Sequence, residues 1–211
     1  SGPLRVEAGG LRIGDGGGSG RLSGESAQLG AGTLLAFNRN DATTYAGEIT
    51  GAGAVRILSG GMTFTGNNSY TGGTTIDPGA GLRLGCGCGT GVLLGNVVNN
   101  GEFAFDRGDA SSFAGQISGR GFVQILSGGV TLTGANNYTG GTEISQGAGL
   151  RLGDGGTSGS ILGDVRNNGV LAFNRGDALN FNGLISGFGN VQLLSGEVIF
   201  DNTQRYTGST S

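Results

Sequence analysis

The sequence contains no histidine, no lysine and no tryptophan, and it has only two prolines and two cysteines among its 211 residues. Without histidine or lysine there can be no histidine-based catalytic triad, no histidine metal site and no lysine nucleophile. Charged residues make up 13% of the chain and the net charge is −3, so no basic field favours nucleic acid as a partner. The composition argues against most hydrolases and against a nucleic-acid-binding protein.

Long apolar runs are also missing. The longest strand-like runs, such as residues 33–37, are far shorter than the roughly 20 residues that a membrane-spanning helix needs. Residues 1–4 carry neither a basic region nor an apolar region of a signal peptide. We therefore expect any secretion signal to lie outside this segment or to have been removed.

The two cysteines, Cys86 and Cys88, are separated only by Gly87. Residues two apart in an extended strand lie near the upper distance limit for a disulfide, so a bridge would require a tight local turn. The pattern favours unpaired thiols in a loop. A metal site would need further ligands, which are not evident nearby, so no metal or cofactor is expected.

What the chain does have is glycine, 50 residues of it, arranged in a long repeat. Tyr70, Tyr138 and Tyr206 are 68 residues apart, and equivalent phenylalanines and isoleucines keep the same interval. Hydrophobic residues form 36% of the chain and fall at fixed phases of this repeat, so a continuous core can be buried. The sequence predicts one continuous domain over residues 1–211, with internal repeats at about 6–75, 76–143 and 144–211.

Apolar anchors within the middle unit give the size of one coil. Leu84, Phe105, Ile125 and Leu152 follow one another at intervals of 21, 20 and 27 residues, and each sits in a short alternating run typical of a strand with one buried face. Three coils per unit predict an all-β, single-stranded parallel β-helix (β solenoid) of about nine coils, right-handed by analogy with parallel crossovers. An antiparallel barrel or sandwich remains the structural alternative, because Asn-Gly pairs can also mark hairpins. The residues expected to point inward are Phe105, Phe113, Ile117, Val123, Ile125, Val130, Leu132, Leu150 and Leu152.

Residues 129–144, with Tyr-Thr-Gly-Gly-Thr at positions 138–142, resemble the passenger-associated transport repeat of type V autotransporters. Residues 62–76 repeat the motif, and residues 198–211 hold a degenerate copy in which Asp201 replaces glycine. The resemblance implies a right-handed β-helix, secretion through a C-terminal outer-membrane barrel that is not part of these residues, and a role as a stalk or folding aid at the bacterial cell surface or outside the cell.

This resemblance predicts a non-enzymatic passenger segment that supports adhesion, autoaggregation or biofilm formation and passenger folding and secretion. The expected partners are a host matrix protein, a cell-surface receptor or a glycan, with end-to-end self-association as a further interaction and no membrane contact except through the absent translocator barrel. Two alternatives remain open: a stem for an upstream protease or esterase domain, and a β-helical enzyme that modifies polysaccharides.

Two Arg-Gly-Asp tripeptides are candidate adhesive turns: Arg107, Gly108 and Asp109, and Arg175, Gly176 and Asp177. The first unit has Asn40 in place of the glycine, which fits a turn that needs glycine or asparagine at positive φ and an aspartate as a cap. A structural turn and an adhesive turn are both compatible with this pattern.

Other polar positions suggest weaker hypotheses. Asp106, beside Arg107 and Asp109, could serve a polysaccharide-cleaving site, but the pattern recurs in all three units whereas an active site is normally assembled once. Glycine-rich turns at 14–17 and 153–156 resemble calcium-binding nonapeptides without their nine-residue period. Arg83 and Arg151 lie at matching phases, so they could belong to polar ladders that contact a glycan or simply face solvent.

Overall fold

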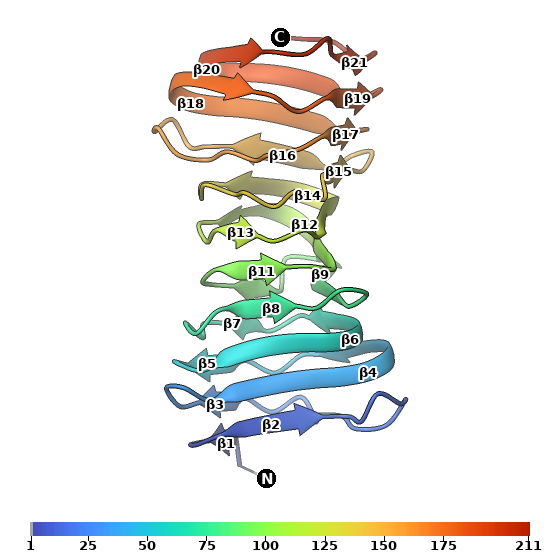
Figure 1. Ribbon diagram of the computed structural model, residues 1–211, viewed down its shortest axis with the longest axis vertical. Coiled ribbons are helices and arrows are strands. Elements are labelled where there is room, and N and C mark those ends of the chain that lie inside the picture. The colour runs from blue at the N-terminus through green and yellow to red at the C-terminus, as the bar shows by residue number, and fades with distance from the viewer. Residues whose placement is uncertain (1) are drawn as a thin grey trace.

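The computed structural model describes residues 2–211, which form a tall stack of short parallel strands (Figure 1). Strands β2, β8 and β11 run from left to right on the near side of Figure 1 while the chain climbs from its N-terminus to its C-terminus. This is the sense of a right-handed coil, as predicted. Among residues 2–211 there is no helix that is long and apolar enough to cross a membrane.

The strands are short where the chain turns often and longer where two faces are joined by a bulge. They are β1 (Leu4–Val6), β2 (Gly10–Ile13), β3 (Ala27–Leu29), β4 (Leu34–Tyr45), β5 (Ile49–Gly51), β6 (Ala54–Phe64), β7 (Asn67–Asn68), β8 (Thr74–Ile76), β9 (Gly81–Cys88), β10 (Val92–Leu93), β11 (Val97–Asn99), β12 (Glu102–Phe113), β13 (Ile117–Ser118), β14 (Phe122–Leu132), β15 (Thr142–Ile144), β16 (Gly149–Leu152), β17 (Val165–Asn167), β18 (Val170–Phe181), β19 (Ile185–Gly187), β20 (Asn190–Phe200) and β21 (Arg205–Tyr206).

Three long parallel ladders run along the stack. The first joins β2, the first halves of β4 and β6, and then β8, β11 and β13. The second joins the second halves of β4 and β6, then β9, the first halves of β12 and β14, and β15, β17, β19 and β21. The third joins the second halves of β12 and β14, then β16 and the first halves of β18 and β20. Every strand pair among residues 2–211 is parallel, which rules out the hairpin-built alternative.

The 68-residue repeat does not correspond to a whole number of turns. The second ladder passes through Leu82, Phe103 and Val123 to Thr142, which is three turns, yet Leu150, the equivalent of Leu82 in the next unit, lies in the third ladder. Each unit therefore makes three turns and advances one further face, a rise of about 16 Å at about 4.8 Å per turn.

The solenoid has about ten turns, one more than the apolar intervals predict. The spacing of the anchors predicts a single coil between Ile125 and Leu152, an interval of 27 residues. That interval contains an additional strand, β15, whose three residues pair with the strand below. β15 is too short to show a clear alternation of apolar and polar residues in the sequence.

The core is a continuous apolar column. All nine residues predicted to point inward are buried, with at most 4% of their surface exposed. Aromatic rings meet edge-on in this column, as between Phe105 and Phe113 of β12, whose ring centroids are 5.8 Å apart. Each such large side chain stabilises the fold by about 1.5–3 kcal/mol on burial, so the column is the main source of stability.

Cys86 and Cys88 form a disulfide, and the prediction of unpaired thiols is wrong. Gly87 between them has φ of 77°, a left-handed conformation that folds the chain sharply and brings the two Cα atoms to 5.2 Å. That separation lies within the range for disulfides. The tight local turn that such a bridge requires is present because Gly87 can adopt this conformation.

Candidate functional surfaces

The Asn136 side chain of the repeat motif joins three successive turns. Its Oδ1 accepts a hydrogen bond from the Ile117 amide at 2.8 Å, on the turn below. Its amide nitrogen donates to the carbonyl of Gly134 in its own turn and to that of Ser160 in the turn above, each at 2.9 Å. Because Asn136 is 2% exposed, these bonds satisfy all of its buried polar groups and leave none for a ligand.

The motif tyrosine and threonine also serve the interior. The hydroxyls of Tyr138 and Thr142 lie 2.6 Å apart and both residues are buried, and Tyr70 and Thr74 repeat the pair at the same distance. Burial raises the pKa of Tyr138 far above its ordinary value, so the phenol stays neutral. The pairing closes the corner between two faces.

The motif glycines are needed where turns approach one another. A Cβ on Gly140 would lie 2.4 Å from the carbonyl oxygen of Gly121 on the turn below, and Gly141 has φ of 89°. A larger residue at Gly140 would push the two turns apart. The Asn136, Tyr138 and Thr142 side chains and the glycine at 140 are therefore committed to stacking one turn on the next.

The Arg-Gly-Asp turns hold a loop in place. The Arg107 guanidinium donates to both carboxylate oxygens of Asp109 at 2.9 Å and to the carbonyls of Gly89 and Gly91 at 3.0 Å, and its side chain is only 10% exposed. Arg175 makes the equivalent contacts with Asp177 and with the carbonyls of residues 157 and 159.

Both charged groups of these tripeptides already have partners within the chain. The hydrogen bonds from Arg107 and Arg175 hold the pKa of Asp109 and of Asp177 below its ordinary value. A receptor that reads Arg-Gly-Asp through its two charges would first have to break this pair. An adhesive role for residues 107–109 and 175–177 stays a prediction.

Gly108 is required for a different reason from the one expected. Neither Gly108 nor Gly176 has positive φ, and no non-glycine residue in the described chain does, so the predicted left-handed turn at Asn40 and its equivalents is wrong. A Cβ on Gly108 would instead lie 2.5 Å from the carbonyl oxygen of Gly87 on the turn below. Close packing, not a backbone twist, selects glycine in the middle unit.

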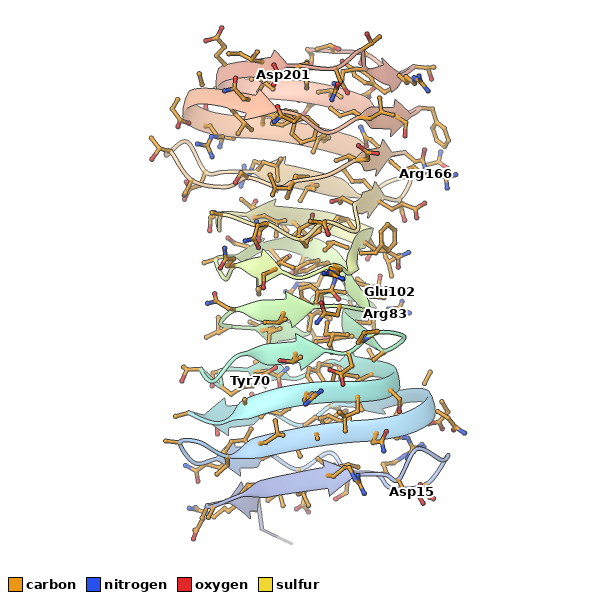
Figure 2. All side chains as sticks on the ribbon, in the orientation of Figure 1. Asp15, Tyr70, Arg83, Glu102, Arg166 and Asp201 are labelled. Carbon is orange, nitrogen blue, oxygen red and sulfur yellow. A yellow bond between two sulfur atoms is a disulfide. The ribbon has the colours of Figure 1, made fainter. Side chains whose placement is uncertain are left out.

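The loops whose carbonyls accept hydrogen bonds from these arginines differ between units. In the outer units the carboxylates of Asp15 and Asp154 accept hydrogen bonds from the amides of Gly17 and Gly156, two residues further on. The middle unit has the Cys86–Cys88 disulfide at the same two positions. Figure 2 shows Asp15 on a loop that projects from the side of the rod.

Asp106 is not arranged as a catalytic acid. Its carboxylate accepts hydrogen bonds from the Arg83 guanidinium and, at 2.7 Å, from the Ser127 hydroxyl. Burial raises its pKa, but these two hydrogen bonds and the charge of Arg83 outweigh burial, so the pKa lies below its ordinary value. The carboxylate is thus ionised and engaged at neutral pH. Sequence reasoning noticed Arg83 but did not connect it with Asp106, because the two residues are 23 positions apart.

Comparison with known proteins agrees with this architecture. Residues 59–80 and 127–148 match the passenger-associated-transport-repeat family. The chain is 33% identical over 162 residues to a protein named adhesin BmaC autotransporter, from Brucella suis biovar 1 (strain 1330). That similarity covers 63% of this chain but only 4% of the length of the adhesin. No solved structure shows a significant match. The two matched repeats, the adhesin relative and the stacked parallel turns together support the assignment of this chain to the autotransporter passengers that carry passenger-associated transport repeats.

Proposed function

We propose that this chain is a non-enzymatic segment of an autotransporter passenger, a β-helical rod displayed at the bacterial surface or secreted, which supports adhesion. The observation that carries the proposal is the structural role of the repeat motif. Asn136, Tyr138 and Gly140 all make contacts that stabilise the stacked turns. A motif of this kind extends a rod and leaves the outer faces free to vary. The adhesin relative supports a contact role for those faces.

The same rod would assist folding and secretion of a longer passenger and would contribute to autoaggregation or biofilm formation. Each turn offers its backbone to the next turn, so a folded turn gives the following residues a template. The partners that we propose are a host matrix protein, a cell-surface receptor or a glycan, and a second copy of the rod for self-association.

A catalytic role is disfavoured by the repetition of the polar residues. Arg39, Arg107 and Arg175 make the same contacts in all three units, each with an aspartate two positions later. An active site is assembled once, whereas these residues perform one structural task three times. Their partners are main-chain carbonyls and a neighbouring carboxylate, which leaves no free acid or base at the turn.

The adhesive role can be tested with the purified chain immobilised on a surface. We expect cells or matrix proteins to adhere to the folded chain, and we expect adhesion to fall to background when the same preparation is unfolded by heat. A β-solenoid of similar length from an unrelated protein controls for the shape alone. Binding equal to that control, by a chain whose circular dichroism confirms its strands, would argue against adhesion.

A further inference from the structure

The two outer units carry the same shallow groove on different faces of the rod. In the first unit the groove has a volume of about 450 Å³ and is lined by Arg12, Ala36 and Leu58 among others. In the third unit a groove of about 300 Å³ is lined by Arg151 and Leu194, with Ala172 between them. These residues occupy equivalent positions of the repeat, so one surface is built twice.

Each groove contains one exposed arginine with no ion-pair partner among residues 2–211, Arg12 or Arg151; the first groove also contains Arg56, which pairs with Asp77. Arg12 and Arg151 take part in no ion pair within residues 2–211, although six other arginines do. The Nε of Arg151 donates to the Thr131 hydroxyl at 3.1 Å, which orients the guanidinium and leaves its outer nitrogens available. A guanidinium in this state favours a carboxylate or another flat anion that can accept two hydrogen bonds.

The middle unit breaks this pattern in a specific way. Its equivalent arginine, Arg83, is bound to Asp106, whereas the outer units have Asn38 and Asn174 at that position. A second carboxylate, Glu102, stands on the neighbouring turn where the third unit has Val170. Figure 2 shows Arg83 and Glu102 close together on the same side of the rod. The middle arginine is thus neutralised by its own chain.

We propose that the grooves of Arg12 and Arg151 each bind one uronate residue of an acidic polysaccharide, and that Asp106 and Glu102 prevent the middle unit from doing so. The sugar carboxylate pairs with the guanidinium. The glycine and alanine floor leaves room for the flat face of the ring, and Leu58 or Leu194 covers its apolar side. This inference deepens the proposed adhesive function by naming a ligand class.

The advance of one face per unit selects a flexible polymer over a flat anionic surface. Arg12 lies in the first ladder and Arg151 in the third. A planar membrane laid along the rod meets one of these faces at a time. A polysaccharide chain can wrap around the rod, or two chains can bind independently, so both arginines contribute.

The test is the stoichiometry of binding of tri-galacturonate, measured by calorimetry at low salt on the purified chain. We expect two sites in the native chain, one site in either Arg12→Gln or Arg151→Gln, and none in the double variant. In the decisive experiment, Glu102→Val with Asp106→Asn gives the middle unit the residues of the third unit, and we expect a third site. Both changes reproduce residues that the repeat already accepts.

Maltotriose, which has no carboxylate, is the matched control and should not bind. The proposal is overturned if the arginine variants keep both sites, if the converted middle unit gains none, or if vesicles of anionic lipid bind while tri-galacturonate does not. Its failure is distinguishable from failure of the proposed function: a chain that adheres to cells without binding tri-galacturonate remains adhesive through another surface, and one that binds tri-galacturonate without adhering is not an adhesin.

Discussion

The middle and third units close the same corner loop with different chemistry. At positions 154 and 156 a side-chain carboxylate accepts a hydrogen bond from an amide, while at positions 86 and 88 a covalent disulfide joins the same two places. In both units an arginine then donates to two carbonyls of that loop. The comparison shows that the fold requires a closed loop with its carbonyls turned toward the arginine, and that the means of closure can vary.

The largest difference between these two units should appear at the motif asparagine. Asn136→Ala leaves the buried Ile117 amide without its partner and removes the second hydrogen bonds of the Gly134 and Ser160 carbonyls, which we expect to lower the free energy of unfolding by about 3 kcal/mol. Gln204, the equivalent in the third unit, is less buried, so Gln204→Ala should lower it by under about 1 kcal/mol. Urea denaturation followed by circular dichroism measures both. Equal losses would show that the two positions are not distinguished by burial.

The loop arginines give the next effect. Arg175→Ala removes the hydrogen bonds that the loop carbonyls at 157 and 159 receive, and we expect a loss of about 3 kcal/mol. Arg107→Ala should cost about 1 kcal/mol less, because the disulfide keeps its loop closed. Thermal unfolding of the two variants checks the order. A larger loss for Arg107→Ala would mean that the disulfide does not support the loop.

Exchanging the closures should have a smaller effect. Cys86→Asp with Cys88→Gly gives the middle loop the residues of the third unit. The lost ring encloses only three residues and contributes about 1.5 kcal/mol by chain entropy, and the new hydrogen bond returns about 1 kcal/mol. We therefore expect a net loss below about 1 kcal/mol in urea. The native chain should show a similar small shift on addition of reductant, and the exchanged variant should show none.

The smallest change near neutral pH should come from the aspartates of the two loops. Hydrogen bonds from arginine place the folded-state pKa of Asp109 and Asp177 below the ordinary value of 3.8. The stability that these pairs contribute is therefore complete above that value and is lost as pH falls through the lower folded-state pKa. Urea midpoints should agree at pH 7 and pH 5 and fall below pH 4. The variant Asp109→Asn with Asp177→Asn should reduce the acid sensitivity, and a fall already between pH 7 and pH 5 would contradict the assignment.

Much of the fold could be predicted from the period of the sequence. Apolar residues such as Phe105 and Ile125 occupy alternate positions along their strands, which places them on the face that is buried. The turn count could not be predicted, because β15 is only three residues long and is recognised by its pairing with β14. Pairings such as Arg83 with Asp106 depend on which strands are neighbours in adjacent turns. Because the repeat is not a whole number of turns, the spacing of residues in the sequence does not identify these neighbours.

The Cys86–Cys88 bridge and the role of Gly108 were missed for local reasons. Whether two cysteines at positions i and i+2 can form a disulfide depends on the φ of the glycine between them, and the residue type alone does not determine that angle. Gly108 was assigned to a left-handed turn because glycine suits either a positive φ or a close approach. The carbonyl of Gly87, one turn below, decides between the two.

The advance of one face per unit has a consequence for how such a protein can change in length by duplication or loss of a repeat. Insertion or deletion of a single 68-residue unit leaves every core contact possible, but it turns all downstream surfaces by one third of a revolution. Only a change of three units returns a distant patch to its original bearing. Gain or loss of a repeat therefore changes the direction in which all downstream surfaces face, without any substitution in those surfaces.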